Sequence, residues 1–344
     1  DDVESRGLGD VYKRQVADYI FDDELVLLAE DGGNFGSKER PIAYRVSGKC
    51  WVNNHAHVLK PKVGLDIDYL CYSLMFYKVD GLINGATRKK LTQAAMRKMQ
   101  IPFRSIKEQI HIVNELNRII KIKEKRQEEL KLLDNLIKAR FVEMFGDVIH
   151  NDRKWECRKF SDITASRLGK MLDTKHQTGT CQYSYLANFN VQWFGFELKN
   201  LNKMDFNEKD REEFCLEDGD LLVCEGGEIG RCAVWHNQVE NCFFQKALHR
   251  VRCNQEIILP DYLAWWFKYN CDHGGFVAIE GAKATISHLT GAKMKMLNVT
   301  VPPIGLQKQF TSFVNQVDKS KVAVQKALDE TQILFDSLMQ KYFG

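Results

Sequence analysis

The sequence predicts an α+β protein in which two repeated α/β domains are joined by two long helices that form an antiparallel intramolecular coiled coil. Three observations support this fold class: landmarks that recur in one order roughly 200 residues apart, two long charged segments with an apolar stripe, and a globular composition. Of the 344 residues, 44% are hydrophobic and 28% are charged. Such a chain can bury the cores of two domains of ordinary size.

The first landmarks are two strand-like phrases in each copy. An apolar run, an acid and closely spaced glycines at 25–36 recur at 220–230, which predicts a strand that enters a tight turn in both copies. GGEIG at 226–230 is similar to a dinucleotide fingerprint, but that fingerprint must open a helix. RCAVW follows instead and alternates like a strand, so we predict a hairpin turn. CWVNNHAHVLK (50–60) then matches CFFQKALHRVR (242–252).

Three further landmarks follow in the same order. DYL at 68–70 recurs at 261–263 and opens an apolar helical stretch each time, and a Gly-Ala pair follows in both copies. The phrase MQIPFRSIKEQ then matches VTVPPIGLQKQ, which aligns Gln109 with Gln309. Because matched landmarks in one order are far more specific than any single one of them, we infer an internal repeat.

A long helix is predicted after each proline phrase. In the second helix, positions spaced alternately by four and three residues are mostly apolar, which is the spacing of a coiled-coil seam, and the first helix has the same stripe with a charged middle. An isolated helix would expose such a stripe to water, so we expect the two helices to pair antiparallel over roughly 60 Å. The predicted seam residues are Val113, Leu116, Ile120, Leu130, Leu133, Ile137 and Phe141 in the first helix, and Phe310, Val314, Val317, Val324, Leu328, Phe335, Leu338 and Tyr342 in the second.

These landmarks divide the chain into five segments of unequal length. The second repeat has 159 residues and the first has 90, a difference of 69, and the missing part corresponds to the opening of the second repeat at 155–196. The first repeat is therefore predicted to be truncated. The expected segments are a non-native leader (1–15), the first repeat (16–105), the first long helix (106–146), the second repeat (147–305) and the second long helix (306–344).

Charge and cysteine usage restrict the possible partners. The formal net charge is only +3, so a nucleic-acid-binding surface would need its positive charge concentrated on one face. No run of 18 apolar residues and no signal peptide is present, which predicts a cytoplasmic protein without a membrane partner. The ten cysteines form no CxxC pair, although five of them between Cys215 and Cys253 leave a metal cluster as an alternative. We predict no metal and no cofactor.

Catalytic motifs are missing from the sequence. There is no phosphate-binding GxxxxGK[ST] loop, no ExK that would complete a magnesium nuclease site, and no NPPY or DPPY segment. His55 and His57 share a predicted strand face and could hold a metal, but the second copy keeps only His249, which favours a packed or hydrogen-bonded histidine. We expect that the chain alone neither cuts nor methylates DNA.

The order of globular repeat and long helix, twice over, with an IP or VPP phrase at each junction, resembles the specificity subunit of type I restriction-modification systems. The resemblance covers nearly everything after residue 15, and the second repeat carries it in WECRKFSDI, CEGGEIGR, PDYLAWWF and VTVPPIGLQKQ. It implies that each repeat is a target recognition domain for half of a split site in double-stranded DNA. It also implies that the helices are a spacer and a platform for two methyltransferase (modification) subunits, which a restriction (motor-nuclease) subunit joins in the full complex.

Lys and Arg suit phosphates and guanine edges, and Asn and Gln suit adenine. TRKK at 87–90 is the strongest basic cluster, although for any single candidate a solvated surface residue is the favoured alternative. The near-neutral charge favours a second hypothesis, a non-catalytic two-headed scaffold that binds proteins or small ligands. The DNA-binding candidates are Lys170, Lys175, Gln177, Asn188, Asn190, Arg231, Gln245, Lys246, Arg250 and Lys283 in the second repeat, and Lys38, Asn53, Asn54, Arg88, Lys89 and Lys90 in the first.

Overall fold

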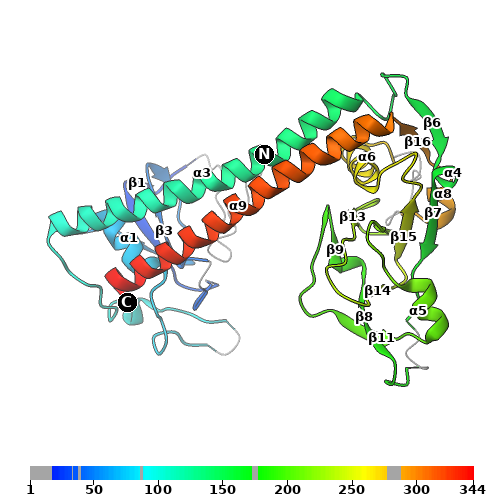
Figure 1. The fold of residues 1–344 in the computed structure, drawn as a ribbon. Coiled ribbons are helices and arrows are strands. Elements are labelled where there is room, and N and C mark those ends of the chain that lie inside the picture. Colours follow the sequence, from blue (N-terminus) through cyan, green and yellow to red (C-terminus); the bar gives the residue numbers. More distant parts are fainter. Residues whose placement is uncertain (1–17, 33, 38–39, 86–87, 173–176, 277–287) are drawn as a thin grey trace. The chain divides into compact units, whose positions relative to one another are not determined.

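The computed structural model describes residues 18–344 except 33, 38–39, 86–87, 173–176 and 277–287 (Figure 1). The chain forms two compact units. The first unit contains Asp1–Leu130 and Ala323–Gly344, and the second contains Lys131–Val322. Each long helix therefore contributes one end to each unit, and the two units are described separately.

The first unit is built on a three-stranded antiparallel sheet with β2 at its centre, between β3 and β5. All five residues of β2 are buried, as its unbroken apolar run predicts. Helix α1 packs on this sheet and begins at Asp66, whose side chain accepts a hydrogen bond from the Tyr69 amide. The elements are β1 (Phe21–Asp22), β2 (Leu25–Ala29), β3 (Ala43–Val46), β4 (Lys49–Cys50), β5 (Ala56–Leu59), α1 (Ile67–Met75) and α2 (Gln93–Met96).

The second unit contains a four-stranded antiparallel sheet, in the order β13-β12-β15-β7, and a three-stranded sheet, in the order β11-β8-β14. Helix α6 covers the first sheet with a buried aromatic face that includes Trp265, Trp266 and Phe267. The strands are β6 (Glu156–Lys159), β7 (Thr164–Leu168), β8 (Gln182–Leu186), β9 (Val191–Gln192), β10 (Gly195–Phe196), β11 (Asn202–Asp205), β12 (Leu221–Cys224), β13 (Cys232–Val234), β14 (Phe243–Phe244), β15 (Leu248–Cys253) and β16 (Asn298–Val301). The helices are α4 (Phe160–Ile163), α5 (Glu208–Phe214), α6 (Pro260–Asp272) and α8 (Gly291–Lys295), with a 3-10 turn η2 (Asn188–Asn190).

The repeat predicted from the sequence is present in both units. The order β3-β2-β5 corresponds to β13-β12-β15, and the hairpin predicted at GGEIG is confirmed by the antiparallel pairing of β12 with β13. The short helices α2 and α8 are capped alike, by the hydroxyls of Thr92 and Thr290. In the described part of the first unit we find no counterpart of β7 or of the β11-β8-β14 sheet.

A buried glutamine at the start of each long helix joins three elements. In the first unit, Gln109 accepts a hydrogen bond from the backbone N–H of Asp66, the N-cap of α1, and donates to the carbonyls of Gly64 and Arg104. In the second unit, Gln307 accepts from the N–H of Leu259, the N-cap of α6. Both side chains are fully buried. Each amide therefore satisfies backbone groups that would otherwise be costly to bury.

Gln307 also donates to the carbonyls of Ile257 and Pro302, which completes the same three bonds that Gln109 makes. The sequence alignment of Gln109 with Gln309 is therefore wrong by two residues. Gln309 is exposed. In the sequence, Gln307 and Gln309 match Gln109 equally well. Only the position of each side chain around α9, relative to the N-cap of α6, shows that Gln307 is the counterpart.

Replacing Gln307 with leucine should lower the free energy of unfolding by roughly 2–4 kcal/mol, because the Leu259 amide and two carbonyls lose their partner. Gln309→Leu is the matched control, since that side chain is exposed and should change stability little. Urea unfolding of the whole chain measures both. Equal destabilisation by the two substitutions would contradict the assigned role of Gln307.

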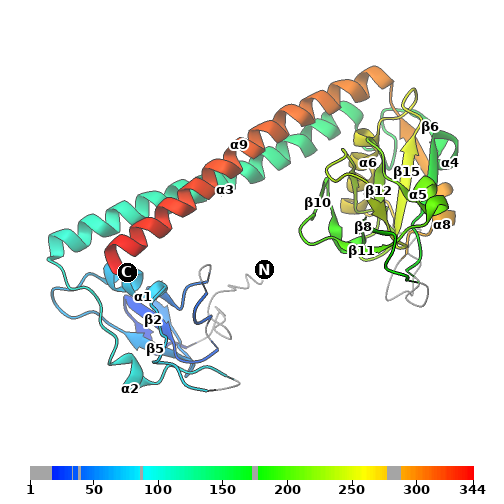
Figure 2. The ribbon, with the colours of Figure 1, turned by 60° about the horizontal axis from the view of Figure 1, so that its bottom comes forward.

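The long helices α3 (Ile106–Phe145) and α9 (Ile304–Phe343) pair antiparallel, as predicted (Figures 1 and 2). In the first unit, Leu116 near the start of α3 shares a core with Phe335 and Met339 near the end of α9. In the second unit, Phe141 near the end of α3 meets Phe310 near the start of α9, with ring centroids 5.5 Å apart. All fifteen residues expected in the seam are buried or half-buried.

Two polar positions interrupt the stripe of α9, and each has a partner on α3. Lys321 forms an ion pair of 2.7 Å with Asp134 in the second unit. Thr331 is buried in the first unit and accepts a hydrogen bond from the guanidinium of Arg126, which also donates to the Ala327 carbonyl. Polar pairs inside an apolar seam are satisfied in one register only, so these contacts oppose slippage of the helices.

Val324→Asp combined with Leu328→Asp should place two carboxylates in the seam and destabilise the first unit by roughly 2–5 kcal/mol. Thermal melting and the hydrodynamic radius report the result. Val322→Asp is the control, because Val322 lies on the same helix but is 70% exposed. A double variant that melts and sediments like the parent would show that these residues are not in a seam.

Candidate nucleic-acid interface

One edge of the four-stranded sheet collects the loops of the second unit. Strand β12 ends at Cys224 opposite Leu248, the first residue of β15, and β7 ends at Leu168 beside His249. Because neighbouring strands run antiparallel, the loops 169–172, 225–231 and 245–247 meet at this edge. We call it the loop edge of the second unit.

Backbone hydrogen bonds tie the loops of this edge together. The amide of Glu225 donates to the Ala247 carbonyl, and the amide of Lys246 donates to the Lys170 carbonyl. Ala247 has a φ of 93°, which an L-residue adopts only when its surroundings hold it there. Leu289, just before α8, donates its amide to Glu225. Side chains at the loop edge therefore project from a backbone that is fixed on several sides.

Asn188 and Arg231, two of the predicted DNA-binding residues, lie together at the loop edge and contact one another. The Asn188 side-chain amide donates to the Gly226 carbonyl over 3.0 Å. The Arg231 guanidinium donates to the Asn188 side-chain oxygen (2.8 Å) and backbone carbonyl (3.0 Å), while its buried Nε has no hydrogen-bond partner among the described residues. This pair holds the turn η2 against the glycine loop that follows β12.

Three other candidates are engaged inside the protein. The Lys170 ammonium donates to the Asp210 carboxylate (2.5 Å) and to the Asp205 carbonyl. The Gln177 side-chain oxygen accepts from the Asp205 amide at 2.7 Å. Asn190 is 1% exposed and bonds the Ala187 amide and the Glu197 carbonyl. These groups build the scaffold of the second unit, because their polar atoms already have partners.

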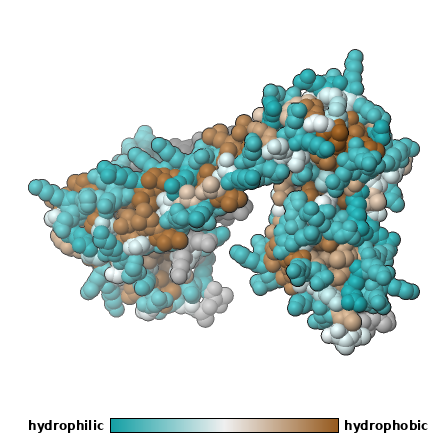
Figure 3. Space-filling model, viewed as in Figure 1, coloured by the Kyte–Doolittle hydropathy of each residue, from teal (hydrophilic) through white to brown (hydrophobic). Residues whose placement is uncertain are grey.

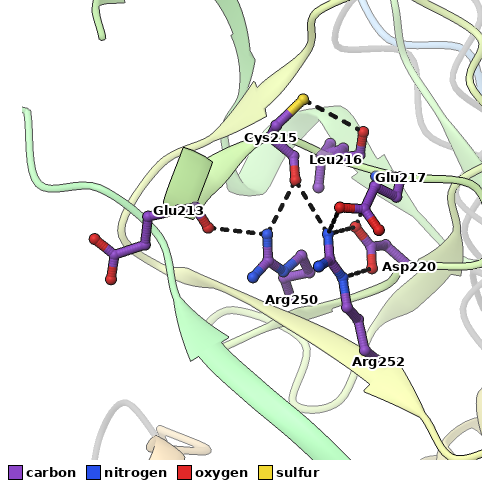
Figure 4. Close-up of polar contacts among 7 residues, drawn as sticks. All are labelled: Glu213, Cys215, Leu216, Glu217, Asp220, Arg250 and Arg252. Atoms are coloured by element: carbon purple, nitrogen blue, oxygen red, sulfur yellow. Dashed lines mark hydrogen bonds and ion pairs between the residues drawn. The ribbon is translucent and has the colours of Figure 1, made fainter. Parts of the chain in front are cut away.

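Arg250 is engaged with the segment that follows α5, as Figure 4 shows. Its guanidinium donates to the carbonyls of Glu213 and Cys215, both at 2.9 Å. Burial lowers the pKa of Arg250, and the neighbouring charge of Arg252 acts in the same direction. Arg252, two residues further along β15, pairs with the buried Asp220 at 2.7 Å. The two arginines fix the loop after α5 to the sheet.

Gln245 and Lys246 are the remaining described candidates of the second unit, and both lie in the loop before β15. Gln245 is half-buried and bonds Leu186 through its backbone amide. Lys246 is exposed, and the part of the chain that the structure describes offers its ammonium no ion-pair partner. Among the candidates placed at this edge, Lys246 is therefore the most available to a phosphate.

The first unit has a corresponding loop edge, where β2 ends at Ala29 beside Ala56, the first residue of β5. Asn53 and Asn54 are exposed in the turn before β5. A bridge between Asp31 and Lys90 places the end of the basic cluster at the same edge.

Most of this basic cluster is paired with acids. Arg88 lies 3.1 Å from Asp31, which also contacts His55 at 2.8 Å, and Lys90 pairs with Glu30 at 3.1 Å. Lys89 is exposed. The predicted candidates Lys38, Lys175 and Lys283 lie outside the described residues.

His57 and His249 have structural roles. Nε2 of His57 lies 2.7 Å from the Leu91 carbonyl, as the packed or hydrogen-bonded alternative predicted. His249 is buried, and burial lowers its pKa, which keeps the imidazole neutral. Within the described residues, no three His, Cys, Asp or Glu side chains are arranged to hold a metal ion.

Burial raises the pKa of the Cys242 thiol to about 12, so this thiol behaves as a small apolar group.

An exposed phenylalanine at the loop edge was not among the residues selected from the sequence. Phe189 lies in η2 between Asn188 and Asn190 and is 57% exposed. Its only signal in the sequence is an aromatic residue between two asparagines. That signal is weak, because most aromatic residues are buried in cores.

Comparison with known proteins identifies the family. The family model of the type I restriction modification DNA specificity domain matches residues 7–132 and 152–331. The chain belongs to this family. A putative type I restriction enzyme specificity subunit from Haemophilus influenzae is 25% identical over 314 residues, which cover 88% of this chain and 77% of the relative.

Solved structures show the same fold at low identity. The S subunit of a type I restriction-modification system from M. genitalium has a TM-score of 0.54 at 14% identity, and the match covers 100% of this chain and 90% of that one. A chain from a structure that describes complex assembly and conformational transition of the type I R-M system has a TM-score of 0.59 at 14% identity. That match covers 93% of this chain and 80% of the other.

Family membership decides between the two hypotheses from the sequence. The chain is a DNA specificity subunit of the type I class and has the non-catalytic, DNA-recognising role of that class, so the two-headed scaffold is not favoured.

Among the described residues, every helix is too short or too polar to span a lipid bilayer.

Lys246→Ala should weaken binding to all duplexes by a similar factor and reduce the slope of log affinity against log salt by about 1, because it removes one phosphate contact. Lys159→Ala is the control, since Lys159 is exposed beside α4, before the start of β7 and away from the loop edge. Mobility shifts at several salt concentrations measure both slopes. An unchanged slope for Lys246→Ala would exclude this residue from the interface.

Proposed function

We propose that this specificity subunit reads a split site in double-stranded DNA, one half with the loop edge of each unit, and directs methyltransferase and restriction subunits to it. The observation that supports the proposal is the repeat of one arrangement. In both units a glycine turn follows the central strand, a buried glutamine anchors the long helix, and candidate polar residues lie at the corresponding edge. A protein that reads two half-sites needs such a duplicated element.

The helices offer a surface on which modification subunits could bind. On α3 in the second unit, Leu132 and Leu136 are exposed although both are apolar. A groove of about 560 Å³ lies further along α3, between α3 and α6, with Val142, Trp265 and Tyr269 in its lining. Hydrophobic side chains gather in patches among hydrophilic ones on the visible face of the protein (Figure 3). Exposed apolar groups beside a groove are typical of protein interfaces, so these residues support a methyltransferase platform.

The two units should contribute unequally to recognition. The loop edge of the second unit is flanked by β7 and by the turn η2, which follows β8. The described part of the first unit has neither element, and its basic cluster is largely paired with Glu30 and Asp31. We therefore assign most of the sequence discrimination to the second unit.

Selection of binding sites from random duplexes, with the methyltransferase partner present, should return one short motif and a weak or absent second motif. Specific complexes are typically about 4–10 kcal/mol tighter than non-specific ones, with about 1–3 kcal/mol for each wrong base pair. Selection with methyltransferase alone is the control. Two equally strong half-sites at a fixed spacing would refute the unequal assignment, and no selected motif would refute the proposed reading.

A further inference from the structure

Phe189 occupies a position that folding alone does not explain. Its ring is 57% exposed, whereas the residues on either side of it in the chain are held by specific hydrogen bonds. Phe194, in the following hairpin, stacks on Trp265 with ring centroids 4.2 Å apart. Phe189 therefore contributes less to the core than its size would allow.

The turn that carries Phe189 is held from three directions. The Asn190 side chain accepts a hydrogen bond from the Ala187 amide and donates one to the Glu197 carbonyl. Asn188 fixes it to the glycine loop through the Gly226 carbonyl and to Arg231. Gln192 donates its side-chain amide to the carbonyl of Phe189 itself over 2.9 Å. An exposed ring on a backbone held in this way is presented in one place, which lowers the entropic cost of a contact.

The charges around the turn limit what it can bind by ionic contacts. Lys170 is paired with Asp210, and Arg231 donates to Asn188, so two cations near the turn are partly occupied. The whole chain has a net charge of only +3. Base recognition at this edge must therefore depend strongly on non-ionic contacts. A phenylalanine can supply these by touching a thymine methyl group or by inserting at a base step.

We propose that Phe189 is a specificity-determining residue that makes an apolar contact with the bases of the half-site read by the second unit. This inference rests on the proposed DNA reading by that unit. The contact adds discrimination and little general affinity, because an uncharged ring gains nothing from phosphates. Its removal should then affect cognate DNA much more than unrelated DNA.

The test compares Phe189→Ala, Phe189→Leu and Phe194→Ala in the complex with the methyltransferase partner. The probes are the duplex selected by the parent protein and a scrambled duplex of the same composition. We expect Phe189→Ala to reduce the ratio of the two affinities by roughly 5- to 150-fold, the equivalent of one wrong base pair, with the scrambled duplex bound as before. Phe189→Leu should restore part of the ratio if the contact is with a methyl group. Phe194→Ala is the phenylalanine control, because the Phe194 ring is stacked on Trp265, and it should keep the ratio.

Two modified probes identify the kind of contact. Replacing single thymines of the selected site with uracil should lower parent binding at one position and leave Phe189→Ala unaffected there, which indicates a methyl contact. In a selected duplex that carries 2-aminopurine in place of one adenine, an increase in fluorescence with the parent but not with Phe189→Ala indicates insertion between bases. Either result supports the proposal. An unchanged affinity ratio in Phe189→Ala, or an equal loss on both duplexes, overturns it while the DNA reading stands. A parent without any preferred duplex overturns both.

Discussion

The structure depends on one side-chain amide at each junction between sheet and long helix. Gln109 and Gln307 each bond the N-cap amide of a short helix, a carbonyl two residues before it, and a carbonyl in the segment that leads into the long helix. A fully buried amide with all three bonds made allows essentially one angle between these elements. In the second unit this amide fixes the start of α6, which packs on the sheet whose loops are proposed to read DNA and lines the groove proposed to receive a methyltransferase.

Much of the fold could be predicted from local patterns. The apolar runs of β2 and β12, the glycine hairpin and the stripe of α9 each follow from periodicity within a few residues, and the structure contains all of them. The register of Gln307 could not be predicted, because it depends on where α6 begins 48 residues earlier in the chain. The same limit applies to the candidate site. The polar side chains of Asn190 and Arg250 suggested DNA-binding residues. In the structure they bond backbone carbonyls that only folding brings close to them.

Electrostatics at the loop edges differ from those expected of a strongly basic DNA-binding surface. At both loop edges, several Lys and Arg side chains are paired with acidic residues or backbone carbonyls, including Arg88 and Lys170. Such pairing holds the loops in place but reduces the charge available to phosphates. A protein of this kind gains less from non-specific attraction to DNA, and the quality of its contacts with bases must supply more of the binding free energy.

The composition of the first unit has a consequence for biosynthesis. Its second core joins Tyr69 and Leu116 to Phe335 and Met339, and Tyr69 also contacts Phe343, with ring centroids 5.2 Å apart. These partners are separated by more than 200 residues, so a ribosome completes the second unit before it releases the residues that close the first. During that interval the apolar face of α3 has no partner and is exposed to chaperones and to aggregation. A nascent chain that stopped before α9 was finished would leave the earliest part of the protein as the part that cannot complete its core.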